Sequence, residues 1–530
     1  MAVPAVFRND WSSVTVPELG AWRPRLRVSV VIPAYDCQPS LDLLLASLAR
    51  QTYPEDLLEV VVVDDGSTPP LVLPPLRPAH TRVIRIDTGD WGIAHACNVG
   101  VRATSGEIVL RLDADMVVFP EHVEAHARWH HQLPYAVTLG TKRFVDIRPD
   151  RPDWPTPEQV ERVGVPGLFD EARTEAHDHI EELLARTDQL RTADHLVFRA
   201  HVGATVGLRR ELFEAAGGFD PALRRGSDTE FGYRLLQAGA LFVPEPAARS
   251  WHLGPSNMMR DRQRMLRYTR PFTADRMPLP RWLRRAGGSG WAVPLVTVVM
   301  PVGAEPLERV RAAVDSVLSG QERDLRVLLV GDWTKLADEP RRVLDDPLLD
   351  LRLIAATYRS DPRVQLVDAA PDSPFPSPYL LRLPATTALA PWAVNRLIDE
   401  ADQHQVGLVR VRLPDGERRV ELWRTAALGR ARWLGWPADE AGLAACVART
   451  HGERMLTPRS AGVVDLLPVP LTQLAAGMGA PRFSAVAGAG ELRWRPTSIE
   501  VTGLRSLIRA VALVARLAVH RAASRIRRRT

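Results

Sequence analysis

Short runs of apolar residues alternate with segments of helical spacing in the first half of the chain. Residues 28–35 form a run rich in β-branched residues, residues 41–51 carry apolar residues at helical intervals, and residues 58–63 form a second run. Apolar runs of this length, without polar alternation, are typical of strands buried on both faces. A strand, a helix and a strand in this order predict a βαβ unit, and hence an α/β fold with a mostly parallel sheet.

Acidic and polar residues stand where these apolar runs end. A third run, residues 107–112, is followed by two carboxylates one residue apart. The residues at the three strand ends are Pro33, Tyr35, Asp64, Asp65, Asp113 and Asp115. Because ligands of a parallel sheet bind beyond the carboxyl ends of its strands, we expect these side chains to share one crevice. Unpaired carboxylates at buried strand ends are costly, so a divalent cation that takes oxygen ligands, Mg²⁺ or Mn²⁺, is expected there.

The second half of the chain repeats this pattern in degraded form. Segments 295–302, 325–332 and 382–391 parallel segments 28–35, 58–65 and 111–120, the last pair without a gap. In the second copy Pro384 stands where Asp113 would be, and Thr386 where Asp115 would be. Such self-similarity predicts a tandem repeat of one fold. Without the carboxylates a metal has no obvious anchor, so the second copy is predicted to lack the chemistry of the first. The sequence leaves two interpretations of the second copy open: it binds an acceptor or contacts a subunit, or it is a structural relic.

Composition and charge exclude several classes of protein. The chain has 530 residues, enough for two or three domains, and a net charge of +5. Eight arginines and no acid lie between residues 502 and 530, which leaves 60 basic against 63 acidic residues elsewhere. A nearly neutral body argues against nucleic-acid binding. The three cysteines form no Cys-x-x-Cys pair, which argues against a disulfide framework or a cysteine-rich zinc site.

Membrane contact is expected only through the end of the sequence. No signal-peptide pattern is visible in residues 1–22, and no stretch reaches the ~20 apolar residues of a membrane span. A basic stripe recurs at helical intervals beside an apolar face, through Arg505, Arg509, Arg516, His520 and Arg527. This pattern predicts an amphipathic helix over 503–530 that lies on an anionic membrane surface, or else docks on the protein. We expect a cytoplasmic protein, peripheral on the inner face of the cell membrane.

The motifs at the strand ends carry a family resemblance. They are Val31-Ile32-Pro33-Ala34-Tyr35, Val63-Asp64-Asp65-Gly66-Ser67, Leu112-Asp113-Ala114-Asp115-Met116, then Gly217-Gly218-Phe219-Asp220, Gly226-Ser227-Asp228-Thr229-Glu230 and Trp251-His252-Leu253-Gly254. In this order they resemble the family 2 glycosyltransferases, closest to the chondroitin-polymerase and N-terminal galactosyltransferase type. The resemblance covers roughly residues 27–254 and implies the Rossmann-like GT-A fold. With the internal repeat, it predicts two GT-A-like domains in tandem.

The resemblance also implies an activity. It predicts an inverting, metal-dependent transferase that moves a sugar from a nucleotide sugar, expected to be a UDP-sugar, to a glycan or lipid-linked acceptor in cell-surface polysaccharide synthesis. A carboxylate takes the proton of the attacking hydroxyl in such a displacement, and a metal offsets charge on the leaving diphosphate. Asp228 is implied as the base, and Asp115 and His252 as ligands of Mn²⁺ or Mg²⁺.

Further positions follow from the same motifs. The implied nucleotide-sugar site consists of Pro33, Ala34, Tyr35, Asp64, Asp65, Asn98, Asp113, Ala114 and Asp115. The implied acceptor contacts are Gly203, Ser227, Glu230 and Trp251. The chain departs from the family pattern at Ser227, where a glutamate is common, and at Cys97, where an arginine is common. The first departure leaves the acceptor open, and the second means that an arginine of the nucleotide side is missing.

Other interpretations compete with these. The segment from Asp64 to Ser67 also suits a simple turn, and Glu230 a favourable helix start. His122, His126 and His130 share one helical face in residues 121–132, for which a solvated face is preferred over a metal site. A nucleotidyl transferase would need a Gly-rich, Lys-bearing phosphate loop that the first strand lacks. The non-enzymatic alternative is a scaffold that binds glycan or nucleotide sugar.

The domain boundaries follow from the resemblance and the repeat. They are 1–26 for an N-terminal extension, 27–256 for the catalytic domain, 257–293 for an Arg-rich linker, 294–470 for the degenerate domain and 471–530 for the C-terminal region. The linker contains nine arginines between residues 260 and 285 and ends in a glycine run. Its arginines face an anionic acceptor or diphosphate, or form salt bridges on a solvated helix, which is the preferred interpretation.

Overall fold

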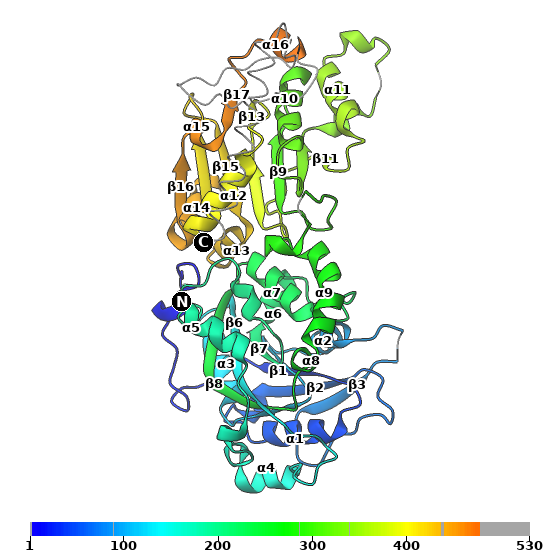
Figure 1. Ribbon diagram of the computed structural model, residues 1–530, viewed down its shortest axis with the longest axis vertical. Helices are drawn as coiled ribbons and strands as arrows, with labels where there is room; N and C mark the ends of the chain where they lie inside the picture. Colours follow the sequence, from blue (N-terminus) through cyan, green and yellow to red (C-terminus); the bar gives the residue numbers. More distant parts are fainter. Residues whose placement is uncertain (1–2, 88, 286, 339, 436–438, 477–530) are drawn as a thin grey trace, which may run out of the picture.

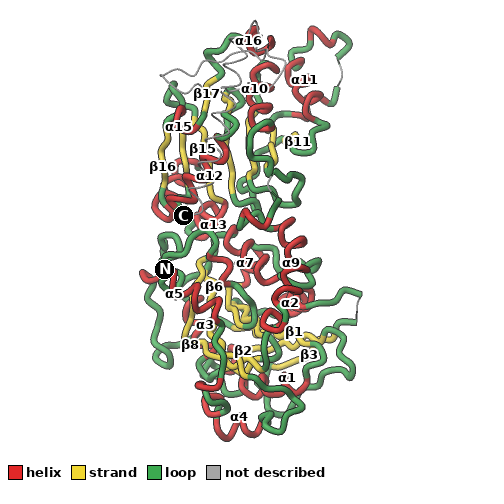
Figure 2. Tube along the Cα trace, viewed as in Figure 1, coloured by secondary structure: helices red, strands yellow, loops and turns green. Residues whose placement is uncertain are grey.

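Two α/β units follow one another along the long axis of the molecule (Figure 1). The computed structural model describes residues 3–476, apart from 88, 286, 339 and 436–438. Each unit has strands at its centre and helices around them, as Figure 2 shows. The predicted α/β class and the tandem repeat are confirmed. The predicted helix over 503–530 lies outside the described residues, and no helix within them is long and apolar enough to cross a membrane.

The sheet of the first unit has eight strands in the order β3-β2-β1-β4-β7-β6-β8-β5. These are β1 (Val28–Ala34), β2 (Leu58–Asp64), β3 (Thr81–Arg85), β4 (Ile108–Leu112), β5 (Met116–Val118), β6 (Ala136–Val145), β7 (Thr205–Arg209) and β8 (Leu241–Leu253). Strands β3, β2, β1 and β4 are parallel, whereas β7 runs antiparallel to both β4 and β6. The half with acidic strand ends is therefore parallel, as predicted, and the other half is mixed.

Helices cover both faces of this sheet. They are α1 (Gln38–Leu48), α2 (Ile93–Arg102), α3 (His122–His130), α4 (Pro157–Val163), α5 (Asp178–Arg186), α6 (Arg210–Ala215) and α7 (Ser227–Gln237). Strands β1 and β2 are buried along their whole length, which explains their mainly apolar sequences, and the polar pair inside them is satisfied because Oγ of Ser29 donates to Oε1 of Glu59 at 2.6 Å. Helix α1 buries Leu41, Leu44 and Leu45 in the core beneath them.

The three histidines of α3 face the sheet, so the predicted solvated face is wrong. His122, His126 and His130 are at most 1% exposed. The Thr205 hydroxyl lies 2.8 Å from Nε2 of His122 and 3.0 Å from Nε2 of His126. The Thr138 hydroxyl lies 2.7 Å from Nδ1 of His126 and 3.0 Å from Nε2 of His130. Burial lowers the pKa of His122 to about 4 and that of His130 to about 3. These histidines therefore form a neutral, hydrogen-bonded layer beneath β6 and β7.

The sheet of the second unit has the same order of strands. Its seven strands run β11-β10-β9-β12-β15-β14-β16, beside a ribbon of β13 and β17. They are β9 (Val296–Pro301), β10 (Leu325–Val330), β11 (Val364–Val367), β12 (Tyr379–Arg382), β13 (Thr387–Leu389), β14 (Leu408–Arg412), β15 (Arg419–Arg424), β16 (Glu453–Leu456) and β17 (Val463–Asp465). The helices are α10 (Leu307–Leu318), α11 (Leu349–Tyr358), α12 (Ala393–His404), α13 (Thr425–Trp433), α14 (Glu440–His451), α15 (Pro458–Ala461) and α16 (Leu471–Ala476). The strands of the two units lie within 27–256 and 294–470, and the boundaries themselves stay predictions.

The Arg-rich linker forms helices α8 (Asn257–Arg260) and α9 (Arg262–Arg276) and, after them, a short 3-10 helix, η6 (Arg281–Leu283). Its arginines pair with acids of both units. Arg276 donates to Asp220 of the first unit, and Arg284 donates to Asp324 of the second at 2.6 Å. These pairs favour the salt-bridge interpretation for this part of the linker.

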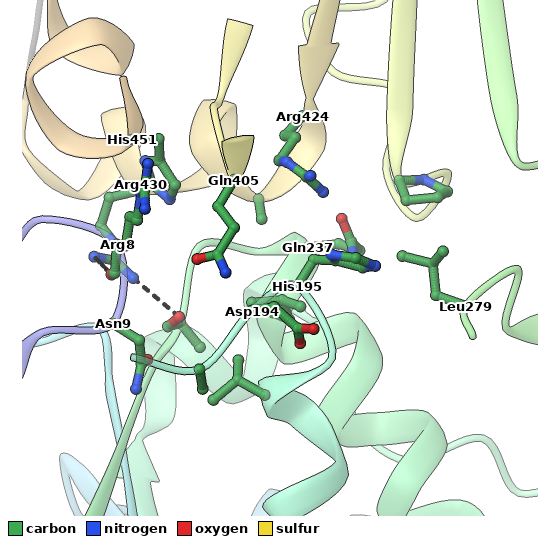
Figure 3. Close-up of a pocket in the computed structure, with 16 residues that line it drawn as sticks. Arg8, Asn9, Asp194, His195, Gln237, Leu279, Gln405, Arg424, Arg430 and His451 are labelled. Carbon is green, nitrogen blue, oxygen red and sulfur yellow. Dashed lines mark hydrogen bonds between the residues drawn. The ribbon is translucent and has the colours of Figure 1, made fainter. Parts of the chain in front are cut away.

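A close contact joins the two units around Arg430 of α13. Its buried guanidinium donates to the carbonyl oxygens of Gly239 and Ala240 in the first unit, and to those of Val6 and Arg8 in the N-terminal segment. A small pocket opens beside it, where Arg8, Arg424 and Arg430 lie opposite Asp194, His195 and Gln237 (Figure 3). The backbones approach so closely that a Cβ on Gly429 would lie 2.6 Å from the carbonyl oxygen of Gln237. The two units therefore meet through backbone as well as side chains.

Candidate active site

The carboxyl ends of β1, β2 and β4 meet at one edge of the first sheet. Ala34 of β1 pairs with Asp64 of β2, and the backbone N–H of Asp65 donates to the carbonyl oxygen of Ala34 at 2.9 Å. The Asp65 side chain is 5% exposed, and its Oδ2 accepts from the N–H of Gly92 at 2.8 Å. Its Oδ1 is buried and has no hydrogen-bond partner among the described residues. Burial raises the pKa of Asp65, and the Gly92 N–H partly offsets this. One buried carboxylate oxygen is therefore left for a donor from a ligand.

Asp64 is committed to its own loop. Its Oδ1 accepts from the N–H of Ser67 at 2.8 Å, and its Oδ2 accepts from the N–H of Leu71 and from Arg85. Burial raises the pKa of Asp64, but the hydrogen bonds outweigh it and hold the pKa below the ordinary value. The structure therefore gives Asp64 the turn-forming role that the sequence left open, with its carboxylate away from the crevice.

Two exposed aromatic rings flank this edge. Tyr35 and Trp91 are 49% and 47% exposed, and their rings meet edge to face with centroids 5.5 Å apart. Pro33 and Ala34 lie in the buried strand beneath them. Trp91 was not predicted, although a tryptophan just before Gly92 and the start of α2 is a usable signal. The pair forms an apolar wall beside Asp65.

A buried arginine, also not predicted, joins the two acidic motifs. Arg111 of β4 is 4% exposed, and its Nη2 donates to Oδ1 of Asp113 at 2.7 Å. Its Nη1 lies 3.1 Å from Oδ1 of Asp228, in the first turn of α7. Burial would lower the pKa of Arg111, but the two carboxylates raise it above its ordinary value. The signal for this residue was a single charge inside an apolar strand.

Gly203 makes this arrangement sterically possible. It has a φ of +69°, and a Cβ there would lie 2.0 Å from Nη1 of Arg111 and 2.7 Å from Cγ of Asp228. Nδ1 of His201 lies 2.7 Å from the carbonyl oxygen of Asp228 and must donate to it. The loop that carries Gly203 therefore holds α7 against β4.

Asp115 and His252 come together through the pairing of β5 with β8. Met116 pairs with His252 in this ribbon, and Nε2 of His252 lies 3.7 Å from Oδ1 of Asp115. Nδ1 of His252 lies 2.9 Å from the carbonyl oxygen of Gly254, to which it must donate, so Nε2 is free to accept. Burial raises the pKa of Asp115, and His252 partly offsets this.

These two side chains fit a divalent metal that is shared with a substrate. A histidine that binds metal through one nitrogen usually donates from the other to a carbonyl, as His252 does. Mg²⁺ in phosphate-transfer sites is commonly held by one or two protein groups plus phosphate oxygens. In the parts of the chain that the structure describes, no cluster of three or more Asp, Glu, His or Cys side chains is arranged to hold a metal alone.

Lys142 of β6 is a further cation at this site that was not predicted. It is one of only two lysines in the sequence and is 9% exposed. Burial lowers its pKa to about 8, against the charges of Asp113, Asp115 and Asp228, which raise it. A side chain of this kind adds positive charge to a crevice that otherwise gathers carboxylates.

Four predicted residues lie in supporting positions. The Asn98 amide donates to and accepts from the backbone of Phe219, which fixes the Gly-Gly-Phe-Asp loop. Glu230 is 2% exposed and pairs with Arg234 on its own helix. Trp251 is 2% exposed in the core, where Nε1 donates to the carbonyl of Val165. Ser227 is buried at the start of α7.

Comparison with known proteins identifies similar sequences. Residues 29–215 match the family described as Glycosyl transferase family 2. Validoxylamine A glucosyltransferase of Streptomyces hygroscopicus subsp. limoneus is 32% identical over 240 residues, which cover 42% of this chain and 50% of that protein. Chondroitin synthase of Escherichia coli is 25% identical over 358 residues, which cover 64% of this chain and 50% of that protein. The chain spans about half the length of the curated relatives it matches.

Solved structures are also similar. The structure of S. aureus TarS 1-349 in complex with UDP-GlcNAc superposes with a TM-score of 0.32 at 19% sequence identity, and the match covers 44% of this chain and 60% of that one.

Proposed function

We propose that this protein, whose residues 29–215 match the glycosyl transferase family 2 model, is an inverting, metal-dependent glycosyltransferase. The donor is a nucleotide sugar, expected to be UDP-linked, and the acceptor is a glycan or glycolipid of cell-surface polysaccharide synthesis. One observation carries the proposal. Asp115 and His252 lie 3.7 Å apart, and Asp113, two residues before Asp115, is joined to Asp228 by Arg111. The names of the relatives, a glucosyltransferase and a chondroitin synthase, support it.

The donor half of the site is the wall of Asp65, Tyr35 and Trp91. The unpaired Oδ1 of Asp65 accepts from an N–H of the base, and the two rings supply apolar contact to the base and ribose. Asp115 and His252 hold a divalent ion, Mn²⁺ or Mg²⁺, which when bound offsets the charge of the leaving diphosphate. Lys142 adds positive charge nearby.

The acceptor half is the start of α7. Asp228 takes the proton of the attacking hydroxyl, a role that requires a carboxylate within hydrogen-bond reach of that hydroxyl. Its side chain is 29% exposed, so one edge faces the crevice while Arg111 holds the other. Arg111 also holds Asp113 and thereby sets the distance between the donor and acceptor halves. Because attack and departure occur in one displacement, no covalent intermediate is needed.

Hydrolysis of a nucleotide-sugar panel without acceptor tests this function. We expect release of nucleoside diphosphate from one donor with Mn²⁺ and none with EDTA. Asp115→Ala should abolish the metal-dependent release, and Asp228→Asn should lower acceptor-dependent transfer by roughly 10²–10⁴-fold. Asp56→Ala, which removes an exposed carboxylate just before β2, at the opposite end of that strand from Asp64, is the matched control.

The alternative is a scaffold that binds nucleotide sugar or glycan without turnover. If the protein binds a donor but releases no nucleoside diphosphate from any donor, in the presence of metal and acceptor, the result would support the scaffold and contradict the proposed enzyme activity. A cytoplasmic, peripheral membrane location rests on residues 503–530 and stays a prediction from the sequence.

A further inference from the structure

The second unit preserves the first unit's site position by position, although its chemistry differs. Strand β12 pairs with β9 as β4 pairs with β1, so Arg382 takes the place of Arg111. In the ribbon of β13 and β17, Thr387 pairs with Asp465 as Met116 pairs with His252 in the first unit. Asp465 therefore stands where His252 stands, and Thr386, one residue earlier, where Asp115 stands.

An arginine occupies the place between these two counterparts. Nη1 of Arg418 donates to Oγ1 of Thr386 at 2.8 Å and to Oδ1 of Asp465 at 2.9 Å, and Nη2 donates to Oδ2 of Asp465 at 2.7 Å. Its Nε donates to Asp415. A guanidinium held by two carboxylates fills the position that a metal and a diphosphate need. The donor half of the second site is therefore closed.

The acceptor half of the second site is open. Glu440, the first residue of α14, lies 3.9 Å from Arg382, as Asp228 of α7 lies beside Arg111 in the first unit. Between α14 and the sheet is a cavity of about 710 Å³. It is lined by Arg382, Arg410, Arg419, Glu417, Glu421, Glu440 and Glu453, with Ala441, Ala444, Ala445 and Ala448 on the helix side. In the first unit Phe219 and Phe231 pack into the core beside Arg111 instead.

Several charged side chains of this cavity pair with one another, and the charges of its lining nearly balance. Nε of Arg410 donates to Oε1 of Glu421 at 2.7 Å, and its Nη1 reaches Glu453 at 3.4 Å. Arg382 lies over the ring of Trp423, with 5.3 Å from Cζ to the centroid. Three guanidinium groups face four carboxylates, so neither a polyanion such as a nucleoside diphosphate nor a strong cation is favoured. A neutral ligand with many hydroxyl groups suits this lining, because each hydroxyl both donates and accepts.

We infer that the cavity between α14 and the second sheet binds a short, uncharged stretch of glycan without metal. Its volume lies within the range of about 300–1,000 Å³ of small-molecule sites. The identification of that glycan as the acceptor chain rests on the proposed function, whereas saccharide binding by the second unit does not. The second unit thus retains the acceptor half of the fold, where it binds the glycan on which the first unit acts.

Calorimetric titration of the full chain tests the inference, with no donor and with EDTA present. The probes are cellotetraose, maltotetraose and chitotetraose. We expect at least one to bind, and Arg410→Ala to weaken its affinity about tenfold or more, because Oε1 of the buried Glu421 carboxylate loses its donor and only Oε2 keeps one, from Trp423. Ala445→Phe fills the cavity from an exposed helix position without removing a charge, and it should weaken binding equally. Arg342→Ala, at an arginine 87% exposed elsewhere in the second unit, is the control.

The outcomes separate this inference from the proposed function. Binding lost in both cavity variants and kept in the control supports it. No binding by any of the three probes at millimolar concentration, or binding that Ala445→Phe leaves unchanged, overturns it. Donor hydrolysis depends on Asp115 and metal and not on the second unit. If the protein hydrolyses the donor but binds none of the three probes, the glycan site of the second unit is contradicted and the proposed function is not. If the acceptor is the bound glycan, Ala445→Phe should raise its KM and leave kcat unchanged.

Discussion

The substitution Gly203→Ala should separate Arg111 from Asp228 while the protein stays folded. Gly203 has a φ of +69°, and the position that a Cβ would take there faces the guanidinium of Arg111. That Cβ would lie 2.0 Å from Nη1 of Arg111 and 2.7 Å from Cγ of Asp228. Both groups must move, and both belong to the link between the donor and acceptor halves.

The size of the effect follows from these distances. Non-bonded heavy atoms are stable at about 3.5 Å, so Nη1 must retreat by about 1.5 Å from its present 2.0 Å. Misplacement of a positioning group by about 1 Å lowers rates by roughly 10²-fold, or about 2.7 kcal/mol in the barrier. The left-handed backbone adds a loss of about 1–2 kcal/mol in the free energy of unfolding.

Steady-state transfer kinetics and thermal unfolding measure the two parts separately. Gly20→Ala is the matched control, because Gly20 has a φ of +74° and no described atom within 4 Å of its Cβ position. Both variants should lose a similar amount of stability from backbone strain, and only Gly203→Ala should lose kcat. A kcat for Gly203→Ala within about threefold of the wild-type value would show that the Arg111–Asp228 link does not govern transfer.

Three other outcomes follow from described contacts. Gly429→Ala should lower the free energy of unfolding by about 1–3 kcal/mol despite the helix preference of alanine, because its Cβ would lie 2.6 Å from the carbonyl oxygen of Gln237 in the first unit. Gly303→Ala, at a glycine with no described atom within 4 Å of its Cβ position, should leave stability unchanged, so equal melting temperatures of the two variants would contradict the contact. The pKa of His122 is about 4 in the folded protein against an ordinary 6.5, so between these two pH values the unfolded chain binds a proton that the folded protein does not. The free energy of unfolding should therefore fall as the pH drops from about 6.5 to 4. Urea midpoints that do not change over that range would refute this. Trp91→Ala should raise the donor KM about tenfold with little change in kcat, because stacking on a base contributes about 1–3 kcal/mol. An unchanged KM in a donor titration would show that Trp91 does not contact the donor.

The order of elements and the edge that carries the site were predictable from local pattern. Strands buried on both faces show unbroken apolar runs, and the carboxyl ends of parallel strands must meet at one edge. Asp65, Asp113 and Asp115 could therefore be placed together from the sequence alone. The tandem repeat was visible for the same reason, because both copies keep the apolar runs even where the second copy lost its acids.

Contacts between distant segments were decided only by the tertiary structure. Arg111 meets Asp228 because β7 begins beside the end of β4, which places the Gly203 loop there, and the chain returns to that loop through α6 to start α7. Helical spacing showed that the histidines of α3 share a face, but it could not show that this face is buried, because Thr205, which contacts His122, lies on a strand 83 residues further along the chain.

The same limit applies to the second unit. Its missing acids could be read directly, yet the closure of its donor half by Arg418 depends on β17 returning beside β13 to place Asp465. Local sequence determines which elements form and which residues stand at their ends, since both depend on near neighbours. Which end groups touch depends on strand crossings and returns, and those are settled by packing of the whole sheet.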